Sequence, residues 1–266
     1  MERTDHAEDV ERAFSHQAES FNASAVANAD EILEAIVQSA QPQPTERWLE
    51  AACGPGIVSR RLARLAGSVH GIDVTPDMIA TARREAETAG IDNATFEVAD
   101  ATNAPAPDSS YDGAVTRFSL HHIPVPSRLL HELARVVRPG GTIAVLDHLA
   151  DDEPEARSWA QEIERLRDPS HWACLSQERL RDLGHNAGLA LDHEQCFSFE
   201  LDFEDWLHRG TTNPDSHDLV EQCLAERPTG TDCFNIHGHT GERVLRLQMW
   251  LGVWRDKRAQ GLRTLA

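Results

Sequence analysis

Residues 48–56 constrain the fold of this chain more than any other part of its sequence. They read WLEAACGPG, a short apolar strand that runs into a Gly-x-Gly turn, and a helical pattern follows over residues 57–66. Gly54 permits a turn that a Cβ atom would obstruct, and Gly56 lets a ligand lie close to the main chain. The next strand ends at Asp73, about 20 residues beyond the glycines. A nucleotide-binding α/β domain places there the carboxylate that accepts from ribose hydroxyls.

The same segment narrows the kind of nucleotide site. A dinucleotide site needs a third glycine, in the pattern G-x-G-x-x-G, and Ser59 occupies that position. A P-loop needs a Gly-Lys-Ser/Thr sequence, and the only lysine of the chain is Lys257. Because a Gly-x-Gly pair also occurs in ordinary turns between a strand and a helix, the function depends on later signals in the chain.

Composition excludes several kinds of partner. The 266 residues suffice for one large domain or for a core domain with a lid, and a net charge of −19 would repel a phosphate backbone, so no nucleic-acid partner is expected. The five cysteines are scattered, which predicts a reduced, cytoplasmic protein. The N-terminus lacks the apolar stretch of a signal peptide, and no apolar run approaches the roughly 20 residues that span a bilayer. We expect a monomer or a homodimer.

The order of patterns along the chain predicts an α/β fold. Residues 8–39 have helical spacing and end at the stiff linker 41–44, QPQP. Strands and helices then alternate over 48–149, which is typical of a parallel sheet covered on both faces. Residues 139–141, PGG, are predicted to end a helix over 127–138. Helices are expected over 155–167 and 176–187, and strands over 189–201 and 245–253. The last strand is expected to run antiparallel beside the sheet edge.

Six segments, in this order and spacing, resemble the class I methyltransferases that use S-adenosylmethionine (SAM). Within that class they are similar to the small-molecule branch of the ubiquinone and menaquinone biosynthesis type, and the resemblance covers nearly the whole chain. The segments are 14–21 with its Phe-Ser…Ala…Phe pattern (a lid helix), 50–56 EAACGPG (motif I), 71–78 GIDVTPDM (the ribose motif), 99–101 ADA (the adenine edge), 118–123 FSLHHI (after the fourth strand) and 138–141 RPGG (before the fifth).

The resemblance implies a Rossmann-like, seven-stranded, mostly parallel sheet with helices on both faces, an N-terminal helical lid and C-terminal lid insertions. The implied units are residues 1–44 (N-terminal helical lid), 45–150 (SAM-binding core) and 151–266 (acceptor-side lid helices and the closing strands of the sheet). The N-terminal lid is expected to close over SAM and the acceptor, which would exclude water from the reaction.

The resemblance also implies a set of cofactor contacts. Asp73 is expected to accept from both ribose hydroxyls and Asp100 from the adenine amino group, while Val74 and Met78 sandwich the adenine ring. The family usually has Asp at the first acidic position of motif I. Glu50 is one methylene longer, so its contact with the SAM amine is expected to be direct or shifted. The residues implied to bind the cofactor are Phe21, Glu50, Ala52, Gly54, Gly56, Asp73, Val74, Met78, Asp100, Ala101 and Phe118.

Histidines are the candidate bases on the acceptor side. His148 follows the fifth strand and His122 lies near the same edge, where ligands bind in open α/β folds. The resemblance adds His171, in a loop that borders the acceptor pocket of relatives. Imidazole has an unperturbed pKa near neutrality, so each of the three is a candidate catalytic base. A base is needed only if the acceptor must first lose a proton, since positioning alone can support an in-line displacement.

The chain is therefore predicted to transfer the SAM methyl group to a small aromatic or heterocyclic molecule, at oxygen, nitrogen or carbon. One alternative keeps the fold and SAM but catalyses a reaction without methylation, such as cyclisation. Another is a nicotinamide-dependent oxidoreductase, against which Ser59 weighs. A compact Cys233, His237 and His239 group could bind zinc, but no fourth ligand is near in sequence, so a polar loop and no metal are expected.

Overall fold

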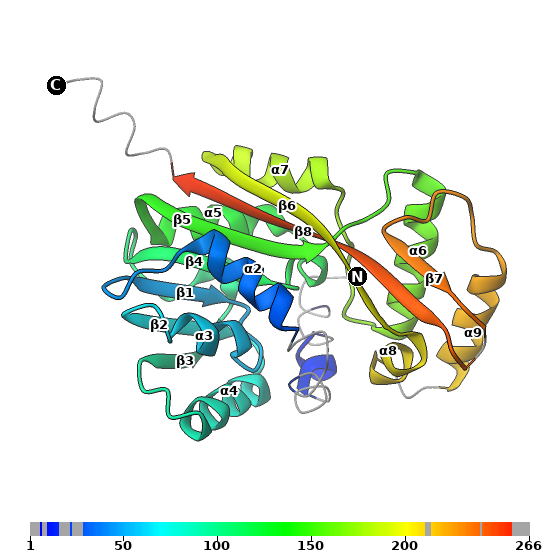
Figure 1. Cartoon of the computed structure of the whole chain (residues 1–266), viewed down its shortest axis with the longest axis horizontal. Coiled ribbons are helices and arrows are strands. Elements are labelled where there is room, and N and C mark those ends of the chain that lie inside the picture. The colour runs from blue at the N-terminus through cyan, green and yellow to red at the C-terminus, as the bar shows by residue number, and fades with distance from the viewer. Residues whose placement is uncertain are drawn as a thin grey trace.

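The computed structural model describes residues 6, 10–15, 22, 29–210, 214–239 and 241–256, and a single mixed sheet organises them (Figure 1). The strand order is β3-β2-β1-β4-β5-β8-β6, with β7 paired to β8. Neighbours among β1 to β5 are parallel, and β8 is antiparallel to β5, β6 and β7. The strands are β1 (Arg47–Ala51), β2 (Ser68–Asp73), β3 (Ala94–Val98), β4 (Tyr111–Arg117), β5 (Val137–His148), β6 (Leu189–Asp202), β7 (Phe234–His237) and β8 (Val244–Asp256).

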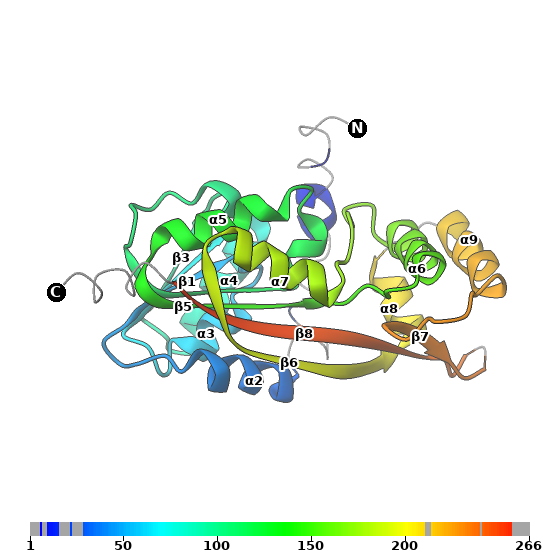
Figure 2. The ribbon, with the colours of Figure 1, turned by 90° about the horizontal axis from the view of Figure 1, so that it is seen from above.

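Helices cover both faces of the sheet, as Figure 2 shows, and the predicted α/β architecture is confirmed. Successive strand residues point to opposite faces, so Trp48 packs in the core cluster beneath α2 and α3, whereas Leu49 packs beneath α5 and α7. The helices are α2 (Asp30–Ala40), α3 (Ile57–Leu62), α4 (Pro76–Thr88), α5 (Pro126–Val136), α6 (Pro154–Arg167), α7 (Gln177–Asn186), α8 (Phe203–Gly210) and α9 (Pro214–Ala225), with the short 3₁₀ helices η1 (Ala101–Asn103) and η2 (Leu120–His122).

The start of β5 differs from the prediction. Helix α5 ends at Val136, and Pro139-Gly140-Gly141 lies inside the strand instead of forming a separate turn. The pairing of β5 with β4 moves from Val137 opposite Tyr111 to Thr142 opposite Gly113, so residues 138–141 form an irregularity in the ladder. Gly140 has a φ of 80°, which lets the chain leave the ladder and rejoin it.

The C-terminal region adds a third apolar cluster beyond the end of the parallel strands. Strands β6 and β8 are 14 and 13 residues long, and their far ends extend past the rest of the sheet toward α6, α8, α9 and β7 (Figure 1). Trp159, Trp206 and Phe234 pack together there with apolar residues of β6 and β8. The short strand β7 makes the sheet eight-stranded, one strand more than the seven expected.

The N-terminal region is described only in part. Residues 10–15 are helical, and α2 begins at Asp30 and ends at Ala40, one residue beyond the span where helix is expected. Gln41 ends α2 in the left-handed conformation, with a φ of 52°, at the start of the predicted linker. Over the residues that the structure describes, none of the helices combines the length and apolar character needed to cross a bilayer.

Candidate active site

A cavity of about 230 Å³ lies at the carboxyl ends of β1, β2 and β4, where the strand order turns from β1 to β4. The helix after β1 covers one face of the sheet and the helix after β4 covers the other, so a crevice forms between them, as is general for open parallel sheets. Its wall includes most residues implied to bind the cofactor, namely Glu50, Ala52, Gly54, Asp73, Val74, Met78, Asp100, Ala101 and Phe118.

Asp73 is held in place by backbone donors at the end of β2. Its Oδ2 accepts from the N–H of Gly54 at 2.8 Å, and its Oδ1 accepts from the N–H of Thr75 at 2.9 Å. Burial raises the pKa of this carboxyl group, while the two N–H donors oppose the increase. Each carboxylate oxygen has a second lone pair, so the fixed group can still accept from a ligand hydroxyl. Gly54 presents its N–H because it adopts a left-handed φ of 50°.

The ends of β1 and β4 both turn sharply beside the cavity. Ala52 has a φ of 53° and Phe118 a φ of 54°, a left-handed conformation that is uncommon without glycine. The hydroxyl of Thr116 donates to the Ala51 carbonyl at 2.8 Å and so ties the two strand ends together. The N–H of Phe118 donates to the Leu146 carbonyl on β5. These bonds hold both turns open toward the cavity.

Among the described cofactor candidates, Gly56 lies off the cavity wall. Gly56 has a φ of 72°, and a Cβ atom there would lie 2.7 Å from the Phe96 ring, so this glycine serves the packing of α3 and does not line the cavity. Asp100 lines the cavity, and its Oδ1 accepts from both the N–H and the hydroxyl of Thr102 at 2.8 Å. Phe21 lies outside the described residues.

Glu50 and Arg117 form a buried charged pair on the cavity wall. Ser59, the residue in place of the third glycine, donates its N–H to Glu50 Oε2 at 2.6 Å and also donates its hydroxyl. Burial raises the pKa of Glu50 to about 7, and Ser59 and Arg117 limit the increase. Burial lowers the pKa of Arg117 to about 10, which Glu50 opposes. The Arg117 guanidinium lies over the Phe118 ring, 5.0 Å from its centroid. Sequence reasoning missed Arg117, because an arginine at a strand end is usually exposed.

His122 is the candidate base that lies on the cavity wall. Its Nδ1 is 3.1 Å from the carbonyl oxygen of Ser170. The Ser170 hydroxyl, also 3.1 Å from Nδ1, donates its own proton to Asp168, so both Ser170 oxygens can accept from Nδ1. This arrangement favours the tautomer with the proton on Nδ1 and a lone pair on Nε2. Burial and the neighbouring His121 lower the pKa of His122 to about 4, which keeps its imidazole neutral near pH 7.

The other two candidate bases lie behind that wall. His171 is buried, and its Nε2 is 2.6 Å from Gln161 Oε1, an amide oxygen that also accepts from the N–H of Cys174. Burial, followed by the nearby histidines, lowers the pKa of His171 well below its usual range. His148 stacks its ring beside that of His121, and burial lowers its pKa to about 3. Neither side chain lines the cavity.

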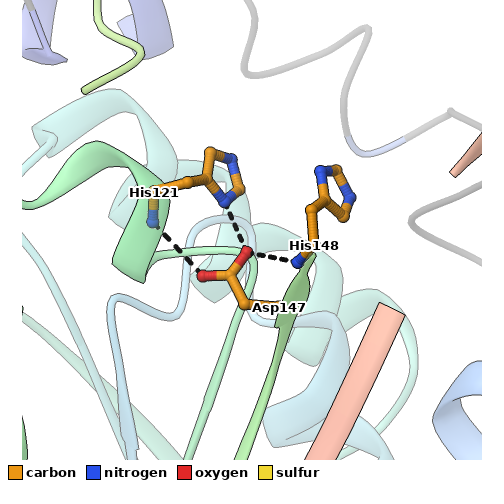
Figure 3. A group of neighbouring side chains, drawn as sticks. All are labelled: His121, Asp147 and His148. Atoms are coloured by element: carbon orange, nitrogen blue, oxygen red, sulfur yellow. Dashed lines mark hydrogen bonds and ion pairs between the residues drawn. The ribbon is translucent and has the colours of Figure 1, made fainter. Parts of the chain in front are cut away.

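A pair that the sequence did not predict joins this histidine group (Figure 3). His121 Nδ1 lies 2.5 Å from Asp147 Oδ1, and the same oxygen accepts from the N–H of His148 at 2.8 Å. Burial alone would lower the pKa of His121, but the Asp147 carboxylate raises it overall. The rings of His121 and His122 lie 4.2 Å apart between centroids. The signal in the sequence was an Asp-His pair that ends β5 and a His-His pair that follows β4.

Residues near the N-terminus cover the cavity. His6, Val10 and Phe14, spaced four residues apart, all line it. His6 Nε2 lies 2.8 Å from the carbonyl oxygen of His122, and the Phe14 ring meets the His122 ring edge-on at 4.8 Å. This end of the chain therefore contacts the candidate base directly.

Comparisons with known proteins agree with this geometry. Residues 49–141 match the family described as "Methyltransferase domain". The chain is similar to the uncharacterized methyltransferase YcgJ of Bacillus subtilis, with 27% identity over 77% of this chain and 81% of that one. It is also 34% identical to a demethylmenaquinone methyltransferase of Clavibacter sepedonicus, over 46% of this chain and 49% of that one.

Solved structures share the fold. The crystal structure of YcgJ superposes with a TM-score of 0.81 at 24% identity, over 86% of this chain and 99% of that one. The [4+2]-cyclase SpnF superposes with a TM-score of 0.63 at 20% identity, over 86% of this chain and 80% of that one. Identities this low show the fold alone.

The fold, the cavity at the turn in strand order and the family match together define the class. These findings support a SAM-dependent methyltransferase with the class I fold, with S-adenosyl-L-methionine as the cofactor. The predicted family is thereby confirmed, including the similarity to the ubiquinone and menaquinone type. The family match and the relatives favour methyl transfer over the alternative of a nicotinamide-dependent oxidoreductase.

Proposed function

We propose that the cavity holds SAM against a small, flat acceptor and that methyl transfer occurs by in-line displacement. The observation that carries this proposal is that the Asp73 carboxylate and the neutral imidazole of His122 line one cavity. Apolar side chains from two segments, among them Phe14, Ile123 and Val125, surround the space between them. Such a wall suits an aromatic or heterocyclic acceptor better than a charged one.

The cofactor contacts follow from the placement of the wall residues. Asp73 takes the ribose hydroxyls, because its carboxylate is fixed by two N–H donors. Asp100 and Ala101, at the start of η1, take the adenine edge, while Val74 and Met78 take its faces. Gly54, Ala52 and the carbonyl of Phe118 lie along the methionine part. Gly56 acts indirectly, by allowing α3 to begin next to Phe96.

Glu50 takes the SAM amine, and Arg117 is positioned for the carboxylate of the methionine part. Both side chains line the same stretch of wall, and their opposite charges match the ammonium and carboxylate of an amino acid. Ser59 holds Glu50 through two hydrogen bonds, so the extra methylene of Glu relative to Asp is accommodated without freeing the carboxylate.

His122 is the general base in reactions whose acceptor must lose a proton. It lines the cavity, it is neutral, and the Ser170 carbonyl fixes the proton on Nδ1 so that Nε2 can accept the proton of the acceptor. His148 and His171 support the wall from behind. The carbon–sulfur bond of SAM breaks as the bond from the methyl carbon to the acceptor atom forms, and the cavity must align these atoms.

Of the three units expected from the sequence, the first is narrowed here. Within residues 1–44, the segment that precedes α2 acts as a lid, because α2 itself packs in the core against the sheet. Residues 45–150 act as the SAM-binding core, and residues 151–266 as the acceptor-side cover together with the closing strands. The cavity of about 230 Å³ is smaller than the roughly 300–1,000 Å³ of typical ligand pockets. The covering residues must therefore move to admit SAM and an acceptor together.

The composition of the chain bears on its cellular compartment and its partners. The five free cysteines suit a reducing cytoplasm, and the net charge of −19 disfavours a nucleic-acid partner. A role in the biosynthesis of small molecules or secondary metabolites fits the size of the cavity, and we propose a monomer or a homodimer.

A product analysis tests the reaction. The purified chain is incubated with SAM carrying a ¹³C-methyl group and a panel of phenols, aromatic amines and heterocycles. Formation of S-adenosylhomocysteine together with a labelled product that is one methylene unit heavier supports methyl transfer. The similarity to SpnF favours one second candidate, cyclisation without methylation. It predicts a product of unchanged mass, no S-adenosylhomocysteine and no incorporated label.

A further inference from the structure

The group His121, Asp147 and His148 has the donor set of a transition-metal site (Figure 3). One donor atom from each residue lies within 4.8 Å of the other two. His121 comes from η2, and Asp147 and His148 are the last two residues of β5. The group therefore joins two neighbouring strand ends behind the cavity wall, and it is separate from the proposed base, His122.

Hydrogen bonding within the protein does not account for the whole group. Asp147 is satisfied, because it accepts from the ring and the backbone of His121 and from the backbone of His148. The Nε2 atom of His148, however, is buried and has no hydrogen-bond partner among the described residues. A buried polar atom without a partner is unfavourable and calls for an explanation such as a bound ion.

The charges around the group favour a cation. The carboxylates of Glu164 and Asp168 lie close enough to His121 to stabilise a positive charge on it. The nearby cation is Arg167, which disfavours charge on His148 but is paired with Glu164 at 3.8 Å. Asp147 contacts both histidines and Asp168 adds negative charge near His121, while Arg167 offsets the charge of Glu164, so a divalent cation would enter a negative environment.

We propose that His121, Asp147 and His148 bind one first-row divalent transition cation. Two imidazole nitrogens with one carboxylate suit zinc, iron, cobalt or nickel, whereas magnesium and calcium prefer oxygen ligands throughout. The cation takes the place of the proton shared by His121 Nδ1 and Asp147 Oδ1, so binding releases that proton. His148 Nε2 supplies the third bond, and water completes the coordination.

Metal titration of the chain alone tests the proposal, with neither SAM nor acceptor present. The chain is prepared without a histidine tag and treated with a chelator. Zn²⁺ is then followed by calorimetry, and Co²⁺ by its visible absorption bands. We expect one Zn²⁺ or Co²⁺ per chain and no measurable binding of Mg²⁺. We also expect affinity for Zn²⁺ to increase as pH rises, because a proton is displaced.

Variants locate the ion. His148→Ala should weaken Zn²⁺ binding by at least about 100-fold, while His193→Ala, at an exposed histidine on β6, should bind as the wild type does. Nε2 of His148 has no partner in the described protein, so this variant should fold, and its melting curve verifies that. His148→Gln provides a second variant of similar size. The proposal is overturned if the wild type binds no ion, or if both His148 variants bind as tightly as the wild type.

The outcome is independent of the proposed methyl transfer. Asp73→Ala should lose SAM affinity and keep the metal, whereas His148→Gln, which keeps a side chain against the Phe118 ring, should lose the metal and keep SAM affinity. If only the Asp73 variant behaves otherwise, the SAM assignment is wrong. If only the His148 variant behaves otherwise, the metal assignment is wrong.

Discussion

The two walls of the cavity are built in different ways. The cofactor wall consists of strand ends and the turns that follow them, and its main contact joins Asp73 to Gly54, which are 19 residues apart. The histidine wall is assembled from η2, the end of β5 and the loop after α6, and His122 meets Ser170 across 48 residues. The first wall depends mainly on backbone turns at strand ends, which the sheet ties together, and the second depends on side-chain packing between distant segments.

The two walls should therefore differ in how they respond to side-chain substitutions. Backbone N–H groups and left-handed turns position the cofactor wall, so one side-chain substitution there should remove one contact and leave the rest in place. In the histidine wall each ring contacts another, with His121 close to His122, His148 and His171. A substitution among these residues should therefore disturb its neighbours as well.

The largest expected effect is on the histidine wall. His122→Ala should lower kcat by about 100-fold or more, with SAM affinity little changed, because Nε2 is lost as the proton acceptor. The measurement is single-turnover methyl transfer to an acceptor found in the product panel, with calorimetry for SAM. The control is His131→Ala, an exposed histidine on α5. A near-wild-type rate in His122→Ala would mean that positioning alone carries the reaction.

The cofactor wall should respond through binding. Asp73→Ala should weaken SAM binding by about 1.5–3 kcal/mol, roughly 10- to 150-fold, because hydrogen bonds to a charged group are lost. Calorimetric titration measures the change, and a melting curve verifies that the core stays folded. Asp77→Ala, at an exposed acid in the first turn of α4, is the matched control. Equal affinities for SAM in Asp73→Ala and Asp77→Ala would remove the ribose assignment.

Glu50 should make cofactor binding depend on pH. Its pKa is raised to about 7, so the carboxylate is mostly protonated at pH 6 and mostly ionised at pH 8. Only the ionised form attracts the SAM ammonium, so SAM should bind up to about tenfold more tightly at pH 8 than at pH 6. Glu50→Gln should flatten this dependence, whereas Glu87→Gln on α4 should keep it. Persistence of the full pH dependence in Glu50→Gln would exclude Glu50 as its source.

The parts of the fold that local patterns encode could be predicted from the sequence. The alternation of strands and helices gave β1 to β5, and the strict apolar alternation of residues 245–253 gave β8. Strand β7 was missed because it is four residues long and lies in the region of weakest pattern. The Pro-Gly-Gly pattern predicts a turn, but the segment lies inside β5, since a sequence pattern does not distinguish a turn from an irregularity inside a strand.

The site residues also fall into those that local sequence patterns predict and those that depend on tertiary packing. Motif I and the ribose motif placed Gly54 and Asp73 on the cavity wall, because both lie where a strand meets a turn. Arg117 was missed because only the packed fold buries it next to Glu50. Among the histidines, the sequence could not tell which ring faces the cavity. That choice depends on how the loop carrying Ser170 packs against η2, a contact between segments that are distant along the chain.

The smallest expected effect on ligand retention is at Phe14, where the N-terminal residues that cover the cavity contact His122. The Phe14 ring packs edge-on against His122 at 4.8 Å, and such ring pairs contribute about 0.5–1.5 kcal/mol. Phe14→Ala should therefore weaken retention of S-adenosylhomocysteine by about 2- to 10-fold if the cover closes over the bound cofactor. Dissociation is measured by stopped flow, with Glu11→Ala, an exposed neighbour, as the control.

A lid and a permanent cover predict different results for Phe14→Ala. With a lid, the unliganded variant should melt like the wild type, because the contact matters mainly in the closed state, and only the dissociation rate should rise. With a permanent cover, the unliganded variant should melt at a lower temperature and dissociation should change little. The second pattern would overturn the lid, because the Phe14 contact would then contribute equally with and without a bound ligand.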